Sequence, residues 1–368
     1  MKKVKLGEVA TFINGYAFKP QDWSSEGKEI IRIQNLTKTS KEINYYSGTI
    51  DKKYIVEDGD ILISWSGTLG VFQWCGKPAV LNQHIFKVVF DKIDIDKSYF
   101  KYVVEKGLQD AIKHTHGSTM KHLTKKYFDN IMVSYTNLKE QQRIASELDL
   151  LSKLILRRQE QLEEFNILVK SRFNEMFESK KFDKVSISEL VDDRIETAKK
   201  IFDQHDTIKY IDISSIDNKN YKMTGFQEYM LNQAPSRAQQ HIRKGDIVVS
   251  TVRPNLKNIA ITELDDENLV ASSGFCVLRA LKCLPEYLFA IICSDRFTNK
   301  MTNIVTGANY PAIKSSDIMN YLIPLPPIKL QNEFADFVAQ VDKSQLAIQK
   351  SLEELETLKK SLMQEYFG

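Results

Sequence analysis

Two short loops in the first third of the sequence combine amide, hydroxyl and aromatic side chains. The loops are SWSGTLG and LNQHI, and their candidate functional residues are Trp65, Ser66, Thr68, Asn82, Gln83 and His84. Amides can form paired hydrogen bonds with adenine, and hydroxyls suit several base edges. These residue types indicate a surface that can read DNA bases.

The second half of the chain carries corresponding loops with different side chains. STVRPNLKN contributes arginine, asparagine and lysine, and VASSG contributes two serines; the arginine fork suits guanine or a phosphate. A third pair, HGSTMKHL and TGANYPAI, is glycine-bearing and polar, as in loops that approach a backbone closely. The candidates in these loops are Arg253, Asn255, Lys257, Ser272, Ser273, Ser118, Lys121, Asn309 and Tyr310. Ordinary turn chemistry is the alternative for each loop, but their matched positions favour the functional interpretation.

An internal repeat explains why the loops correspond. LKEQQRIASELDLLSKLI from Leu138 aligns without gaps on IKLQNEFADFVAQVDKSQ from Ile328, an offset of 190 residues. The same offset matches Phe177 to Phe367, and upstream EDGDILIS matches RKGDIVVS with small shifts. A period this long, present twice, is typical of gene duplication and not of a solenoid.

Two long helices are predicted at the ends of the repeated units. Residues 138–180 and 327–367 contain no glycine, and their only proline is Pro327. Apolar residues recur at alternating spacings of about four and three, which is typical of a coiled-coil seam. The predicted seam residues are Ile144, Leu148, Leu151, Ile155, Leu162, Phe165, Val169, Phe334, Val338, Val341, Ile348, Leu352, Leu355 and Leu362. We expect the helices to pair with each other; the alternative is that each packs on its own lobe.

The rest of each half reads as a mixed α/β lobe. Short β-branched runs such as DILISW and GDIVVS come first, and a helical stretch follows near 99–113 and 286–300. We therefore predict an α+β fold with two similar mixed α/β lobes, separated by two long antiparallel helices that form a coiled coil. The predicted division is 1–137 and 181–326 for the lobes, and 138–180 and 327–368 for the helices.

Composition is that of a folded protein without a membrane span. Hydrophobic residues make up 42% and charged residues 27%, and no apolar run reaches 18 residues, so we expect a cytoplasmic protein. The first lobe has 20 basic and 15 acidic residues, net +5, whereas the second balances at 18 and 18. A basic lobe is compatible with phosphate contacts and equally with a solvated surface. The cysteines form no CxxC pair, so neither a zinc site nor a disulfide framework is expected.

Three features together resemble the specificity subunits of type I restriction-modification systems. They are the opening KLGEVATFINGYAF, the GDIL and GDIV strands, and the helix entries LKEQQRIA and PLPPIKLQNEFADFVAQVDK. The resemblance covers the whole chain. The first helix entry departs from the family pattern, because SYTNLKEQQ lacks the prolines of PLPPIKLQN.

The resemblance implies a non-catalytic subunit that binds a bipartite DNA target and directs adenine methylation or restriction by its partners. Each lobe would read one half-site, and the helices would set the gap between half-sites. Two methyltransferase subunits would dock on this scaffold, and two motor-nuclease restriction subunits would join the full complex. S-adenosylmethionine, ATP and magnesium would belong to those partners, so no cofactor is expected on this chain.

Motifs for catalysis are missing from the sequence. The only Pro-Pro pair follows Leu325, so the [DNS]PP[YF] tetrapeptide of amino-methyltransferases is absent, and GVFQWCGKP fails the phosphate-loop spacing. The histidines of HTHGSTMKH have no nearby carboxylate or thiolate. Two alternatives stay open: a metal-dependent DNA endonuclease with scattered carboxylates, and a coiled-coil scaffold that binds no DNA.

Overall fold

The computed structural model describes the chain except residues 115–123, 179, 193 and 307–310. The described residues divide into two compact units. The first unit comprises Met1–Gln159 with Lys350–Gly368, and the second comprises Glu160–Gln349. Each unit therefore contains one lobe and segments of both long helices.

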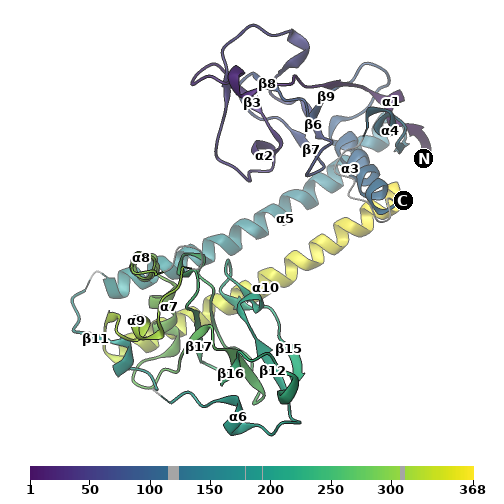
Figure 1. Ribbon diagram of the computed structural model, residues 1–368. Helices are drawn as coiled ribbons and strands as arrows, with labels where there is room; N and C mark the ends of the chain where they lie inside the picture. The colour runs from purple at the N-terminus through teal and green to yellow at the C-terminus, as the bar shows by residue number, and fades with distance from the viewer. Residues whose placement is uncertain (115–123, 179, 193, 307–310) are drawn as a thin grey trace. The chain divides into compact units, whose positions relative to one another are not determined.

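The lobe of the first unit is built on two small sheets (Figure 1). One is antiparallel with the order β2-β9-β6-β7, and the other has the order β4-β3-β8-β5 with β3 and β8 parallel. The strands are β1 (Lys2–Lys5), β2 (Thr11–Asn14), β3 (Lys28–Ile31), β4 (Tyr45–Tyr46), β5 (Ile55–Val56), β6 (Ile61–Ser64), β7 (Gly70–Gln73), β8 (Ala79–Leu81), β9 (Ile85–Val89) and β10 (Met132–Tyr135). The helices are α1 (Leu6–Val9), α2 (Ile33–Leu36), α3 (Lys97–His114) and α4 (Lys125–Asp129).

The lobe of the second unit repeats this plan. Its sheets have the orders β18-β17-β20 and β15-β12-β19-β16, and β12 and β19 are parallel. The strands are β11 (Lys184–Ser186), β12 (Thr207–Ile211), β13 (Ile216–Asp217), β14 (Lys222–Met223), β15 (Gln227–Met230), β16 (Ala238–His241), β17 (Ile247–Ser250), β18 (Ile259–Ile261), β19 (Leu269–Ser272), β20 (Phe275–Leu278) and β21 (Leu322–Pro324). The helices are α6 (Ala198–Ile201), α7 (Pro285–Cys293), α8 (Asp295–Asn303) and α9 (Ser315–Met319).

The shared strand order confirms two repeated mixed α/β lobes. In each lobe the strand after the Gly-Asp pair, β6 or β17, lies next to two antiparallel neighbours and is buried along its whole length. Gly59 and Gly245 have φ values of 82° and 88°, a conformation that favours glycine. The repeated Gly-Asp pair therefore marks the tight turn that begins this central strand.

The long helices are α5 (Leu138–Phe173), which continues into a π-helical turn (Asn174–Glu178), and α10 (Ile328–Phe367). Their 36 and 40 residues correspond to about 54 and 60 Å. All residues of the predicted seam are buried or half-buried. Several leucines off the seam are exposed, such as Leu156 and Leu346.

Within each unit a segment of α5 packs against a segment of α10. In the first unit Ile144 and Leu148 share a core with Met363 and Phe367, and the Tyr366 hydroxyl donates to Glu147 at 2.6 Å. In the second unit the rings of Phe173 and Phe177 each lie 5.5 Å from the ring of Phe334. Within each unit, the start of one long helix thus lies against the end of the other.

A buried glutamine fixes the entry of each long helix in the same way. Gln141 accepts a hydrogen bond from the Asp96 backbone at 2.8 Å and donates to the Thr136 carbonyl at 2.7 Å. Gln331, 190 residues later, accepts from Leu284 at 2.9 Å and donates to the Pro326 carbonyl at 2.8 Å. Each amide therefore links the long helix to the start of the lobe's own helix, α3 or α7.

Candidate nucleic-acid interface

Strand register brings the predicted loops of the first lobe to one edge of its antiparallel sheet, the edge formed by the ends of the strands. Ser64 at the end of β6 pairs with Ile85 at the start of β9 and with Gly70 at the start of β7. Asn14, the last residue of β2, pairs with Phe86. The start of loop 65–69 and the end of loop 82–84 therefore lie side by side, although they are separated in the sequence.

Trp65 organises this edge through its own contacts. Its indole Nε1 donates to Oδ1 of Asn14 at 3.1 Å, and its ring stacks on Phe86 with centroids 5.7 Å apart. The His84 ring lies 5.5 Å from the Trp65 ring, and the Nε2 atoms of Gln83 and His84 are 3.3 Å apart. The half-buried Trp65 thus holds Asn14 and His84 in place at the edge of the sheet.

The remaining candidates of the first lobe differ in their exposure. Thr68 is exposed, and its carbonyl accepts a 2.5 Å hydrogen bond from the Ser64 hydroxyl, which folds the loop back on the strand. Asn82 and Gln83 are half-buried, whereas Ser66 is buried. Ser66 is thus covered in this conformation, and its role as a contact residue stays a prediction.

Three predicted loops also meet in the second lobe. Ser250, at the end of β17, pairs with Phe275 at the start of β20. Thr251 donates from its backbone at 3.0 Å and from its hydroxyl at 2.9 Å to the carbonyl of Gly274. The Arg253 backbone donates to the Pro311 carbonyl at 2.8 Å. The loops 251–258 and 272–274 and the chain at 311–313 thus form one edge.

The candidates at this edge fall into two groups. Arg253, Asn255 and Ser273 are exposed, as a contact surface requires. Ser272 is buried, and its hydroxyl accepts a hydrogen bond from the Gly274 backbone at 3.2 Å, so this hydroxyl stabilises the turn. The predicted residues Ser118, Lys121, Asn309 and Tyr310 lie outside the described residues.

Lys257 uses its ammonium group within the lobe. Its Nζ donates to Oδ1 of Asp295 at 2.7 Å and to the Cys293 carbonyl at 3.3 Å. Burial, the largest single influence, lowers the pKa of Lys257, but the hydrogen bond and charge of Asp295 together with the neighbouring Tyr221 raise it, so the net pKa of Lys257 is raised. The conformation therefore directs the Lys257 ammonium away from a ligand at the loop surface.

An aromatic cluster next to the first edge was not among the predicted residues. Tyr16 forms a bridge with Asn82, and its ring lies 5.0 Å from Phe18 and 5.6 Å from Tyr54. Phe18 in turn lies 5.2 Å from Tyr46. The segment NGYAFK contains two of these rings, but only the fold brings Tyr46 and Tyr54 to them.

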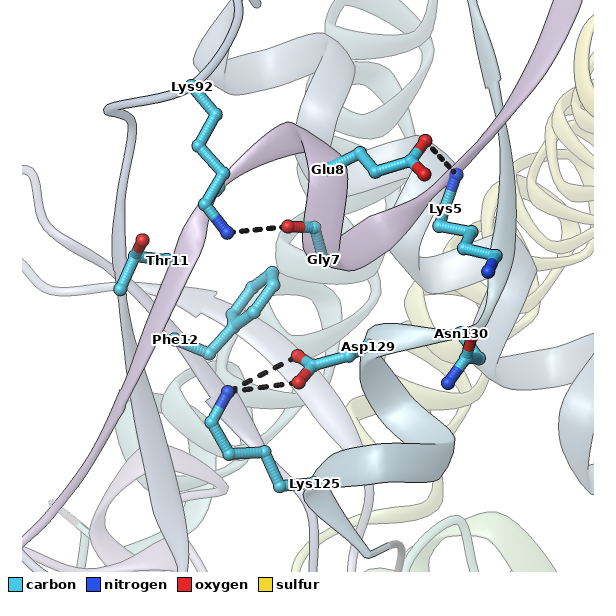
Figure 2. Close-up of a pocket in the computed structure, with 10 residues that line it drawn as sticks. Lys5, Gly7, Glu8, Thr11, Phe12, Lys92, Lys125, Asp129 and Asn130 are labelled. Atoms are coloured by element: carbon cyan, nitrogen blue, oxygen red, sulfur yellow. Dashed lines mark hydrogen bonds and ion pairs between the residues drawn. The ribbon is translucent and has the colours of Figure 1, made fainter.

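A pocket of about 270 Å³ lies at the opposite edge of the same sheet (Figure 2). There Thr11 begins β2, and its hydroxyl donates to Asp91 at 2.8 Å. Figure 2 shows Lys92 donating to the Gly7 carbonyl and Lys125 paired with Asp129 inside the pocket. Because these amines are engaged and the pocket lies at the far end of the strands, it is separate from the candidate interface.

Metal-ligating side chains form no metal-binding cluster in the part of the chain that the structure describes. No group of three or more His, Cys, Asp or Glu side chains could hold a metal ion there. His116 and His122 of the histidine cluster are outside that part. All four cysteines are free, and burial raises the pKa of Cys276 and of Cys283 to about 11. No helix among the described residues is both long enough and apolar enough to span a membrane.

Comparison with known proteins gives consistent results. A family described as "type I restriction modification DNA specificity domain" matches residues 1–164 and 179–358. The type I restriction enzyme MjaVIII specificity subunit of Methanocaldococcus jannaschii is 26% identical over 340 residues, which cover 85% of this chain and 79% of the relative. The EcoBI specificity subunit of Escherichia coli is 23% identical over 405 residues, covering 99% of this chain and 85% of the relative.

A solved structure shows the same fold. The type I restriction-modification S subunit from M. genitalium aligns with a TM-score of 0.58 at 13% identity, covering 100% of this chain and 96% of that chain. The family matches cover most of the sequence and both repeated lobes. This chain belongs to the type I restriction-modification DNA specificity domain family.

Proposed function

We propose that this chain is the DNA sequence-recognition subunit of a type I restriction-modification complex, and that it binds a bipartite target. The observation that carries this proposal is that the two lobes share a similar scaffold but carry loops with different side chains. Both lobes place their loops at the end of the central strand, β6 or β17, but one edge offers Asn82 and Gln83 and the other Arg253 and Asn255. A repeated scaffold with different loops suits two different half-sites.

Recognition would divide between positioning and reading contacts. Lysine and arginine side chains along the DNA would bind phosphates and fix the register, whereas the loop side chains would read base edges. Amides at the first edge match the donor and acceptor pattern of adenine, and the Arg253 fork matches guanine. Each lobe would thus supply its own part of the specificity.

The long helices would act as the spacer between half-sites. We propose target-recognition domains at 1–137 and 181–326, and spacer helices at 138–180 and 327–368 that form an antiparallel coiled coil. The shielded seam and the contacts of α5 with α10 in each unit support this arrangement.

The chemistry would belong to partner subunits. Two methyltransferase subunits and two restriction subunits would assemble on this chain in the cytoplasm, and would bind S-adenosylmethionine, ATP and magnesium. The chain itself would direct adenine methylation or cleavage without a catalytic site. The names of its relatives and its family membership support this division of labour.

Substitution of Arg253 tests the assignment of the second lobe. We expect Arg253→Ala to weaken binding to duplexes with the correct second half-site by about 1–3 kcal/mol, the value of one good base contact. Arg243→Ala is the matched control, because Arg243 precedes β17 and pairs with Glu196 at the opposite edge of the same lobe. Competition binding with duplexes altered in either half-site measures the effect. An equal loss on every DNA sequence would contradict the assignment.

A further inference from the structure

The reading loop of the second lobe, residues 251–258, adopts left-handed backbone at residues that carry side chains, whereas the same loop of the first lobe does so at a glycine. Arg253 and Lys257 have φ values of 49° and 53°, which side-chain-bearing residues rarely adopt. The first lobe places Gly67, with a φ of 65°, in its corresponding loop. Because residues in sparsely populated conformations persist only where the surroundings hold them, the second loop needs a restraint that the first does not.

The structure shows such a restraint at the end of the loop. Lys257 is bound to Asp295, the first residue of α8, and the Asn218 side chain donates to the Leu256 carbonyl at 2.9 Å. Pro254 between the two strained residues is buried. Asp295 is the one of these partners that binds Lys257 through an opposite charge, so it restrains the second strained residue directly.

Asp295 also binds the long helix of its own unit. Its Oδ2 accepts a 2.5 Å hydrogen bond from Nζ of Lys170 on α5, while its Oδ1 accepts from Lys257. These two lysines hold the pKa of Asp295 at about 2, compared with an ordinary value of 3.8. The carboxylate is therefore charged at neutral pH, and its contribution is lost only as the pH falls through this range toward 2.

We propose that Asp295 is a positioning residue for DNA reading by the second lobe: it holds the strained loop 251–258 through Lys257 and ties that loop to α5 through Lys170. This inference rests on the proposed function. Asp295 touches no base in this role; it fixes the backbone from which Arg253 and Asn255 project. The spacer helix and the reading loop of the second lobe are thereby linked by one carboxylate.

The test uses the full chain in complex with a methyltransferase subunit, and duplexes altered in one half-site at a time. We expect Asp295→Asn to reduce discrimination against an altered second half-site on the order of tenfold, the scale of one base contact, and to leave the first half-site unaffected. Asp295→Glu keeps the charge and should restore most of the discrimination. Glu196→Gln, which removes another exposed ion pair of the lobe, should change neither half-site.

Two further measurements separate positioning from folding and from phosphate binding. Lys257→Met should reproduce the effect of Asp295→Asn, and the double variant should lose little more, because both changes release the same hold. The salt dependence of binding should stay at the wild-type slope, since no phosphate contact is removed. Wild-type discrimination by both single variants, or an equal loss at both half-sites, would overturn the inference. A wild-type complex that recognises no split sequence would instead contradict the proposed function.

Discussion

Replacement of Asp246 by alanine is expected to destabilise the second lobe by about 3–5 kcal/mol, the cost of leaving a buried charge without its partner. Asp246 accepts hydrogen bonds from Nε and a terminal nitrogen of Arg279 at 2.9 and 2.7 Å. The side chains of Asp246 and Arg279 are only 2% and 14% exposed, so water cannot replace the lost carboxylate. The aspartate of the repeated Gly-Asp pair is thus structural.

The first lobe contains a natural control for this prediction. Asp60 occupies the same place in the repeat and pairs with Lys87 at 2.7 Å, but their side chains are 22% and 18% exposed. Both aspartates also cap the turn before their strand, by accepting from the backbone of Glu57 or Arg243. Both alanine variants lose this cap, so its free energy cancels when the two variants are compared. We expect loss of the Asp60–Lys87 ion pair to contribute about 1 kcal/mol to the cost of Asp60→Ala.

Hydrogen exchange resolved by peptide is the suitable measurement, because a chain with two units need not unfold in one step. Asp246→Ala should accelerate exchange in β17 and β20 and leave β6 and β9 protected. Equal effects of the two alanine variants, each in its own lobe, would show that burial does not distinguish these ion pairs.

Replacement of Phe334 by alanine is expected to cost about 3–5 kcal/mol, the usual range for a buried phenylalanine. Phe334 is fully buried, and its ring contacts Phe173 and Phe177 at the end of α5. Loss of the Phe334 ring would leave a cavity and remove the aromatic contacts that hold the end of α5 against the start of α10. Exchange of the backbone amides in 160–178 should therefore accelerate most.

Phe337 provides the matched control one helical turn further along α10. It is half-buried, and the Arg172 guanidinium carbon lies 5.9 Å from the centroid of its ring. We expect Phe337→Ala to cost about 1 kcal/mol or less, the scale of an exposed cation–π contact. Similar losses for the two variants, or protection of 160–178 in Phe334→Ala, would contradict the packing described for the second unit.

Much of the fold follows from short-range patterns in the sequence. The absence of glycine over 138–180, together with apolar spacings of about four and three, predicts a long helix with one shielded seam, and the burial of Ile144 and Leu148 agrees with it. The repeat predicts two similar lobes, and the corresponding strand orders of their sheets confirm the similarity. These features depend on local periodicity or on internal similarity, so one sequence suffices to find them.

The arrangement of the loops depends on contacts that no local pattern specifies. Loops 65–69 and 82–84 meet only because Ser64 pairs with both Gly70 and Ile85. The partner of Lys257 is an aspartate 38 residues away, and Ser66 is buried although its neighbour Thr68 is exposed. Residue type identifies a polar loop, but strand register and burial decide which of its side chains face outward.

Single-molecule sequencing of methylated adenines tests the central claim most directly. DNA from cells that express this chain with a cognate methyltransferase subunit would be compared with DNA from cells that lack the chain. The proposed function predicts a new split motif, methylated only when the chain is present, with one half-site altered by Arg253→Ala. An assembled and active methyltransferase that adds no new motif would contradict it.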